Sequence, residues 1–166
     1  ICCRGLHCCC NISETRLHLG ALNKQSHLEN VLMVKDEITV RVRYAETDRM
    51  GYVYYGNYAT YFEVARVELL RKLGINYVDM EDSGIALPVA EMTVKYLKPA
   101  FYDQLLTVRT TITEAQGVRI KFSHDTFNDA EELINSAEIT LVFINTSNKK
   151  PCAIPEEVKL AILQKS

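Results

Sequence analysis

The sequence predicts an α+β fold in which one long helix lies in the curve of an antiparallel sheet of about five strands. Two patterns carry this prediction. Apolar residues alternate with polar ones over residues 37–43, and they repeat at three and four residues over 57–73. Several strand-like segments follow, with only one further short helix. Because a single helix can be covered only by a sheet that curls around it, this order predicts a wrapped helix.

Length and charge limit the classes of function. The chain has 166 residues, which suits one domain with a substantial core. Its 19 Lys and Arg residues nearly balance its 21 Asp and Glu residues, so no overall positive field would attract nucleic acid or an anionic membrane. No apolar run approaches the roughly 20 residues of a membrane helix. We therefore expect neither nucleic acid nor a membrane as a partner.

Cysteine usage indicates a reducing compartment. Five of the six cysteines fall within the first ten residues, where adjacent thiols make a poor disulfide framework, and Cys152 stands alone near the other end. We therefore predict a cytoplasmic protein. A Cys/His zinc site in "CCRGLHCCC" would not match the usual ligand spacings, so we expect no metal.

The N-terminal segment differs from the rest of the chain. Residues 1–32 show no hydrophobic periodicity, and Arg4 and His7 interrupt the apolar run that a secretory signal would need. We interpret 1–32 as a disordered tail or a non-native extension, with Met33 as a candidate start. A single domain is then expected over 33–166.

The first strand and the long helix follow from their periodicities. From Glu37 onward, Ile38, Val40 and Val42 alternate with polar residues, as in a strand with one buried face. The helix is predicted over 57–73, with Asn57 as N-cap and Gly74 as the first residue beyond its end. Its apolar stripe consists of Tyr58, Tyr61, Phe62, Ala65, Leu69 and Leu73, whereas Glu63, Arg66, Glu68, Arg71 and Lys72 are expected on the other faces.

The remainder is predicted to be mostly β-structure. A loop rich in Asp, Ser and Gly leads to the strand "PVAEMTVKYL", which Pro99 ends with a bend or edge. Strands over 105–114 and 118–127 are separated by "AQG", and residues 128–130 turn the chain into the last strand. A short helix follows Pro155. The buried face of the last strand should consist of Ala137, Ile139, Leu141 and Phe143.

Three stretches resemble a known family. They are "YAETDRMGYVYYGNY" over 44–58, "FEVARVELLR" over 62–71 and "YLKPAFYDQL" over 96–105. In these motifs the chain resembles the hotdog-fold acyl-CoA thioesterases of the 4-hydroxybenzoyl-CoA thioesterase-like family, over roughly residues 36–145. The resemblance implies a hotdog fold, hydrolysis of an acyl-CoA thioester to acid and free CoA, and no cofactor. It also implies a homodimer or homotetramer joined through edge strands, with the site at the interface.

The resemblance assigns Asp48 as the catalytic carboxylate, either as nucleophile or as general base for water. Thioester hydrolysis needs an activated oxygen on one side of the carbonyl, which a carboxylate provides. Taken alone, an aspartate in such a loop is more often the cap of a turn. Glu63 is the second candidate, because another branch of related thioesterases uses a helix glutamate, although it also fits an ordinary surface acid.

Stabilisation of the oxyanion is assigned to the start of the helix. Free amides at a helix N-terminus point toward developing negative charge, so Gly56, Asn57 and Tyr58 are the candidate oxyanion and substrate-binding residues. Many relatives carry a histidine where this chain has Tyr55. A tyrosine with a pKa of about 10 donates a hydrogen bond but is a poor base at neutral pH, so Tyr55 is a candidate polar assistant.

The phosphates of CoA favour basic side chains. Arg119 and Lys121, on one predicted strand, are the named candidates, and further ones are Lys95, Lys98, Lys149 and Lys150. His124 is expected at a sheet surface or an interface rather than in catalysis. Two rival functions remain open: an acyl-thioester-binding module without turnover, and a thioesterase that acts on acyl-ACP.

We expect that removing residues 1–32 leaves assembly and turnover intact, because this segment offers no apolar face to a core. The measurement compares the thermal midpoint and the hydrolysis rate of the truncated and full-length proteins. A large drop in either value would contradict the interpretation and revive the zinc hypothesis.

Overall fold

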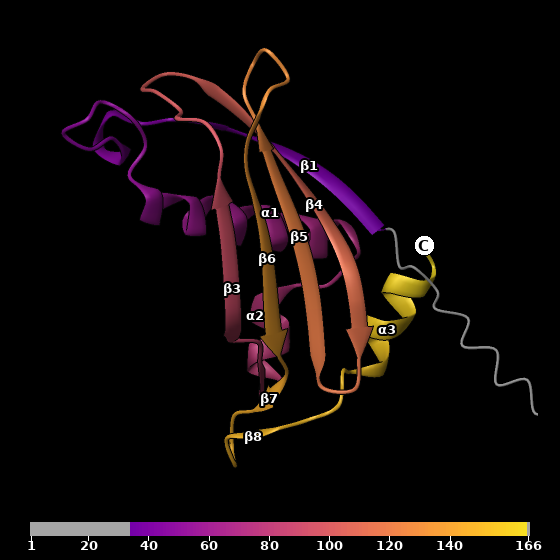
Figure 1. Cartoon of the computed structure of the whole chain (residues 1–166). Helices are drawn as coiled ribbons and strands as arrows, with labels where there is room; N and C mark the ends of the chain where they lie inside the picture. The colour runs from indigo at the N-terminus through magenta and orange to yellow at the C-terminus, as the bar shows by residue number, and fades with distance from the viewer. Residues whose placement is uncertain (1–33, 166) are drawn as a thin grey trace, which may run out of the picture.

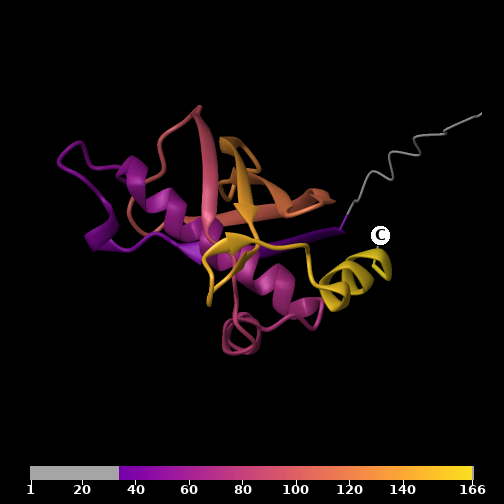
Figure 2. The same cartoon turned by 90° about the horizontal axis from the view of Figure 1, so that it is seen from below.

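The computed structural model describes residues 34–165 and contains the predicted α+β architecture. Five antiparallel strands form a curved sheet in the order β1-β4-β5-β6-β3, and helix α1 (Tyr58–Lys72) lies along one of its faces (Figures 1 and 2). The predicted fold class is confirmed. The predicted tail over 1–32 and the candidate start at Met33 lie outside the described residues.

The elements follow the predicted order, with additions. The sheet strands are β1 (Val34–Arg41), β3 (Val89–Tyr96), β4 (Leu105–Gln116), β5 (Arg119–Phe127) and β6 (Leu133–Val142). The remaining helices are the one-turn η1 (Tyr44–Glu46) and η2 (Tyr55–Asn57), then α2 (Tyr77–Asp82) and α3 (Glu156–Leu163). Within residues 34–165, no helix is long and apolar enough to cross a membrane.

Strand β1 confirms the predicted alternation but begins earlier. It starts at Val34 rather than Glu37 and runs antiparallel to β4, with Val34 opposite Ile112. Val42 lies just beyond the strand and is still buried. The inward face of β1 is therefore apolar except at Asp36, which is in phase with Val34 and Ile38 and pairs with Lys72 of α1.

Helix α1 buries the predicted stripe except Leu73, which is only partly buried, and it also buries Arg66 and Leu70. Tyr58, Tyr61, Phe62, Ala65 and Leu69 are all buried. Arg66 was predicted on an outer face, yet only 6% of it is exposed, and its Nε has no hydrogen-bond partner among the described residues. The prediction was wrong because Arg66 lies one turn after Phe62, at the margin of the buried stripe, where a long side chain is covered by its neighbours.

The two ends of α1 differ in how they are capped. Gly74 adopts φ +81° and donates to the Arg71 carbonyl (2.9 Å), while Ile75 donates to Leu70 (2.9 Å). These bonds form a Schellman motif, which confirms the predicted end. Asn57 precedes the first residue of α1, but its side chain accepts no capping hydrogen bond. Asn57 therefore occupies the predicted N-cap position, but without the capping hydrogen bond.

Two small elements were not predicted. Helix α2 falls in the stretch interpreted as a loop, and its cap is the Asn76 side chain, which accepts from Val78 N at 3.2 Å. A second sheet joins three two-residue strands: β2 (Ile85–Ala86), β7 (Ile144–Asn145) and β8 (Lys150–Pro151). Elements this short are below the length at which periodicity is informative.

The last two strands of the large sheet are not its edges. Strands β5 and β6 lie inside the sheet. The edge strands are β1 and β3, and β3 pairs only with β6 among the described strands. In Figure 1, β3 stands at the left edge, opposite β1.

His124 lies in the core rather than at a surface, contrary to the prediction. It is completely buried, its Nδ1 is 2.9 Å from Thr110 Oγ1, and its ring stacks on Phe62 at 5.1 Å. Its Nε2 has no hydrogen-bond partner within residues 34–165. Burial, and secondarily the charge of Arg66, lowers the pKa of His124 to about 3. The imidazole is therefore neutral in the folded protein at ordinary pH.

This lowered pKa predicts acid sensitivity. The unfolded chain takes up a proton at His124 below about pH 6.5, whereas the folded protein does not until about pH 3. The free energy of unfolding should therefore fall as the pH drops below about 6.5, by about 2 kcal/mol at pH 5. Urea unfolding at pH 7 and pH 5 measures this loss, and His124→Gln should show a smaller one. An equal loss in both proteins would show that the acid sensitivity does not come from the lowered pKa of His124.

Candidate functional site

Asp48 lies in a tight turn between β1 and η2. Its Oδ1 accepts a hydrogen bond from Met50 N at 2.8 Å, and its carbonyl accepts one from Gly51 N at 3.0 Å. Gly51 has φ +84°, a conformation that glycine adopts without strain. The turn-capping role that we considered for Asp48 is thus present. It occupies one carboxylate oxygen.

Glu46 anchors this loop to α1. Its carbonyl accepts from Tyr54 N at 2.9 Å and from Asn57 Nδ2 at 2.7 Å, and its Oε2 accepts from the Tyr61 hydroxyl at 2.7 Å. Burial, followed by this hydrogen bond, raises the pKa of Tyr61. Glu46 was not singled out in the sequence, because a partner fifteen residues away has no local pattern. The loop is consequently fixed relative to the helix start.

The third motif stretch lies against the first. Val53 N donates to the Ala100 carbonyl at 2.8 Å, and Tyr52 forms an isolated bridge with Phe101. The loop of Asp48 is therefore held on one side by α1 and on the other by the segment that follows β3. Two stretches far apart in sequence form one wall of the candidate site.

A pocket of about 480 Å³ opens between these segments. Asp48, Tyr55 and Tyr58 are the predicted site residues that line it. Burial, followed by the neighbouring Tyr96, raises the pKa of Tyr58 to about 12, so its hydroxyl stays protonated. The other lining residues are Met50, Tyr52, Val53, Tyr96, Leu97, Lys98 and Pro99. One carboxylate, several hydroxyls and an apolar wall therefore meet in a single cavity.

The helix start beside the pocket has free amides. Tyr55 and Gly56 open η2, so their N–H groups have no partner within it, and among residues 34–165 no hydrogen bond to a neighbouring loop uses them. A Cβ at Gly56 would lie 2.7 Å from a ring carbon of Tyr54. The glycine therefore lets the Tyr54 ring pack over the backbone at this point.

The predicted oxyanion residues are only partly assembled. Tyr58 lines the pocket, whereas Gly56 and Asn57 belong to the same turn but not to its lining. The Asn57 side chain is directed at the Glu46 carbonyl and positions the loop instead. Tyr55 is 62% exposed, and its carbonyl accepts from the Tyr96 hydroxyl at 3.1 Å.

Glu63 lies outside the pocket that Asp48 lines in its own chain. It is exposed on α1 and absent from the pocket lining. On one flank of α1, the Tyr61 hydroxyl bonds to Glu46, and Lys72 bonds to Asp36 of β1. Helical geometry puts Glu63 on the opposite flank of α1. That flank faces away from β1.

Arg119 and Lys121 lie far from the pocket of their own chain. Tyr96, at the pocket end of β3, is level with Asn135 on β6, whereas Arg119 opens β5 at the opposite end of the sheet. The separation along the strands is about 20 Å. Lys121 is also paired with Glu114 at 2.8 Å. Within one chain, neither residue is positioned to hold CoA at this pocket.

No group of three or more metal-binding side chains occurs within residues 34–165. The pocket instead combines a partly free carboxylate with backbone amides and tyrosine hydroxyls. Such a set activates an oxygen nucleophile and stabilises an oxyanion. These are the two requirements of acyl transfer to water.

Comparison with known proteins identifies the family of this chain. The family model of the thioesterase-like superfamily matches residues 42–162. The chain belongs to this superfamily. Its hotdog fold and the family predicted from the three motif stretches are thereby confirmed.

Relatives in the thioesterase-like superfamily are similar over most of the chain. The acyl-CoA thioester hydrolase YbgC of Escherichia coli O6:H1 is 34% identical over 119 residues, covering 72% of this chain and 89% of that protein. The acyl-CoA thioesterase YbgC of Haemophilus influenzae is 33% identical over 123 residues, covering 74% of this chain and 90% of that protein. The structure of a DHNA-CoA thioesterase from Staphylococcus aureus is similar, with 39% sequence identity and a TM-score of 0.71. The similarity covers 73% of this chain and 81% of that one.

Proposed function

We propose that the protein is an acyl-CoA thioesterase that hydrolyses an acyl thioester to a carboxylic acid and free CoA. The observation that carries the proposal is the shared pocket of Asp48 and the start of α1. The relatives support it, because proteins with this fold and similar sequences bear the names acyl-CoA thioester hydrolase and DHNA-CoA thioesterase.

Asp48 is the proposed catalytic carboxylate. One of its oxygens is held by Met50 N, which fixes the side chain and leaves the other oxygen for chemistry. That oxygen attacks the thioester carbon, or it takes a proton from a water that attacks. The C–S bond then breaks, and the CoA thiolate leaves and takes up a proton. On the nucleophile route, water afterwards cleaves the acyl-Asp48 anhydride.

The amides of Tyr55 and Gly56 are the proposed oxyanion donors. No other backbone group of the described residues uses either amide, and both belong to the turn that leads into α1, whose dipole favours negative charge at this end. Tyr55 adds an exposed hydroxyl at the pocket rim, which donates a hydrogen bond rather than acting as a base.

Assembly into a homodimer, or a homotetramer built from two dimers, belongs to the same proposal. The site would then lie where two subunits meet, in the cytoplasm, and take acyl-CoA as substrate. The exposed apolar side chains at the pocket support burial by a partner; they are Met50 and Leu97 in its lining and Phe101, which bridges to Tyr52.

We expect Asp48→Asn to lower kcat by a hundredfold or more, because an amide neither attacks a thioester nor accepts a proton from water. Asparagine is nearly isosteric, and its carbonyl keeps the hydrogen bond from Met50 N, so the fold and the affinity for CoA should be retained. Hydrolysis of a panel of acyl-CoA and acyl-ACP thioesters by purified protein measures the effect and separates the two carriers.

Glu63→Gln is the matched control, since it removes a second carboxylate by the same chemical change. It should retain most of the turnover. If Glu63→Gln is inactive while Asp48→Asn is active, the helix glutamate is the catalytic carboxylate. If the unaltered protein binds acyl-CoA without hydrolysing it, the binding-module alternative holds.

A further inference from the structure

The peptide group that joins Tyr55 to Gly56 is held at its carbonyl end. Its oxygen accepts a hydrogen bond from the Tyr96 hydroxyl at 3.1 Å. Its N–H belongs to Gly56, at the start of η2, and among residues 34–165 no hydrogen bond to a neighbouring loop uses it. A peptide group is planar and trans, so its N–H and C=O point in opposite directions. Whatever fixes the Tyr55 carbonyl therefore also fixes the direction of the Gly56 N–H.

Glycine makes this constraint important. A peptide group next to glycine rotates between orientations at little cost, because glycine tolerates backbone angles that other residues avoid. A residue with a side chain does not fit at position 56, since a Cβ there would lie 2.7 Å from a ring carbon of Tyr54. A contact from outside the turn is then what favours one orientation of the peptide over the other.

Tyr96 is a well-anchored donor for this contact. It is the last residue of β3, and it pairs with Asn135 of β6. Its ring contacts the rings of Tyr58 and Tyr55, with centroid distances of 5.7 and 6.4 Å. Partial burial, followed by the neighbouring Tyr55, raises the pKa of Tyr96. The hydroxyl therefore keeps its proton at neutral pH and remains a hydrogen-bond donor.

The hydrogen bond joins two walls of the Asp48 pocket. Tyr55 and Tyr96 both line this pocket, although they lie 41 residues apart in the sequence. The Tyr52 hydroxyl also belongs to the lining, but it donates to the side chain of Met50, at 2.9 Å from Sδ. Tyr96 thus ties the sheet to a backbone carbonyl of the turn before α1, whereas Tyr52 orients no peptide group.

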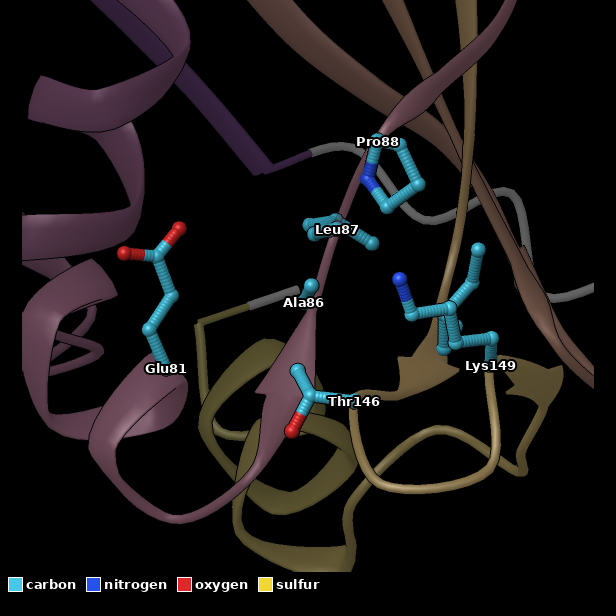
Figure 3. A pocket seen from close by; sticks show the side chains of 7 residues that line it. Glu81, Ala86, Leu87, Pro88, Thr146 and Lys149 are labelled. Carbon is cyan, nitrogen blue, oxygen red and sulfur yellow. The ribbon is translucent and has the colours of Figure 1, made fainter.

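A larger pocket at the other end of β3 lacks such an arrangement. It has a volume of about 600 Å³, and its lining includes Glu81, Thr146 and Lys149 (Figure 3). Among its described lining residues, Glu81 is the only one from a helix, and it lies in the last turn of α2. The last turn of a helix leaves carbonyls rather than N–H groups without partners, so it offers no donor to an oxyanion. The contact made by Tyr96 is therefore a feature of the Asp48 pocket.

We propose that Tyr96 is a positioning residue for thioester hydrolysis, and that its hydroxyl holds the peptide between Tyr55 and Gly56 so that the Gly56 N–H points at the developing oxyanion. The hydrogen bond also polarises the peptide group, which makes its N–H a stronger donor. Tyr96 itself forms no covalent bond and transfers no proton during the reaction. This role rests on the proposed thioesterase function.

Kinetics of Tyr96→Phe test the role, because this change removes the hydroxyl and keeps the ring that packs on Tyr58. We expect kcat to fall about fivefold to tenfold, as for one hydrogen bond that acts in the transition state, with KM changed by less than about twofold. Tyr102→Phe is the matched control, because Tyr102 is exposed and lies outside the pocket lining. The measurement uses the acyl-CoA that the parent protein hydrolyses fastest. An unchanged kcat in Tyr96→Phe, or a raised KM at unchanged kcat, would overturn the proposal.

Nuclear magnetic resonance tests the orientation of the peptide without any turnover. Tyr55 and Gly56 form the only Tyr-Gly pair in the sequence, so tyrosine labelled at the carbonyl carbon and glycine labelled at nitrogen give a single doubly labelled peptide. A hydrogen bond to a peptide carbonyl moves the resonances of that carbon and nitrogen to higher frequency. Both should move to lower frequency in Tyr96→Phe and stay in place in Tyr102→Phe. Unmoved resonances in Tyr96→Phe would overturn the proposal.

The two measurements together separate the possible outcomes. If kcat falls while the resonances stay in place, the Tyr96 hydroxyl acts on the substrate directly, and the positioning role is excluded. If the parent protein binds acyl-CoA without hydrolysing it, the proposed function fails. Moved resonances would in that case still show that Tyr96 orients the Gly56 amide, whereas unmoved ones would exclude the orientation as well.

Discussion

The burial of one side of α1 against the concave sheet is the constraint on which the rest of the structure depends. Phe62, Ala65 and Leu69 are almost completely buried, and the sheet residues that face them are equally inaccessible. A flat sheet would cover only part of such a helix, so the curl of the strands and the packing of α1 require each other. The Schellman motif ends the helix where its apolar stripe ends.

This packing also determines where chemistry is available. Because α1 is held along the sheet, its N-terminal amides have a fixed direction, and the loop before it must return across them. Glu46 ties that loop to Tyr61 and Asn57, while Val53 ties it to the chain beyond β3. The position of Asp48 is therefore set by residues that take no part in the proposed reaction. A site held in this way loses little entropy when a substrate binds.

The concave side of the sheet is covered unevenly. Helix α1 packs mainly over β1 and β4, and β3 remains exposed along nearly its whole length. Several buried polar atoms, among them atoms of Asp36, Arg66, His124 and Asn135, lack hydrogen-bond partners within residues 34–165. Such atoms reduce the stability that the apolar core supplies.

Local sequence determined the elements whose residues interact with near neighbours. The alternation before Val42, the stripe from Tyr58 to Leu73 and the glycine at 74 are short-range patterns, and the structure confirms them. The motif stretches likewise indicated Asp48 and the fold family. Only the tertiary structure decided which strands form the edges, that Arg66 and His124 are buried, and that Glu46 holds the loop. Each depends on contacts between residues distant in sequence, and such contacts leave no periodic signal in the chain.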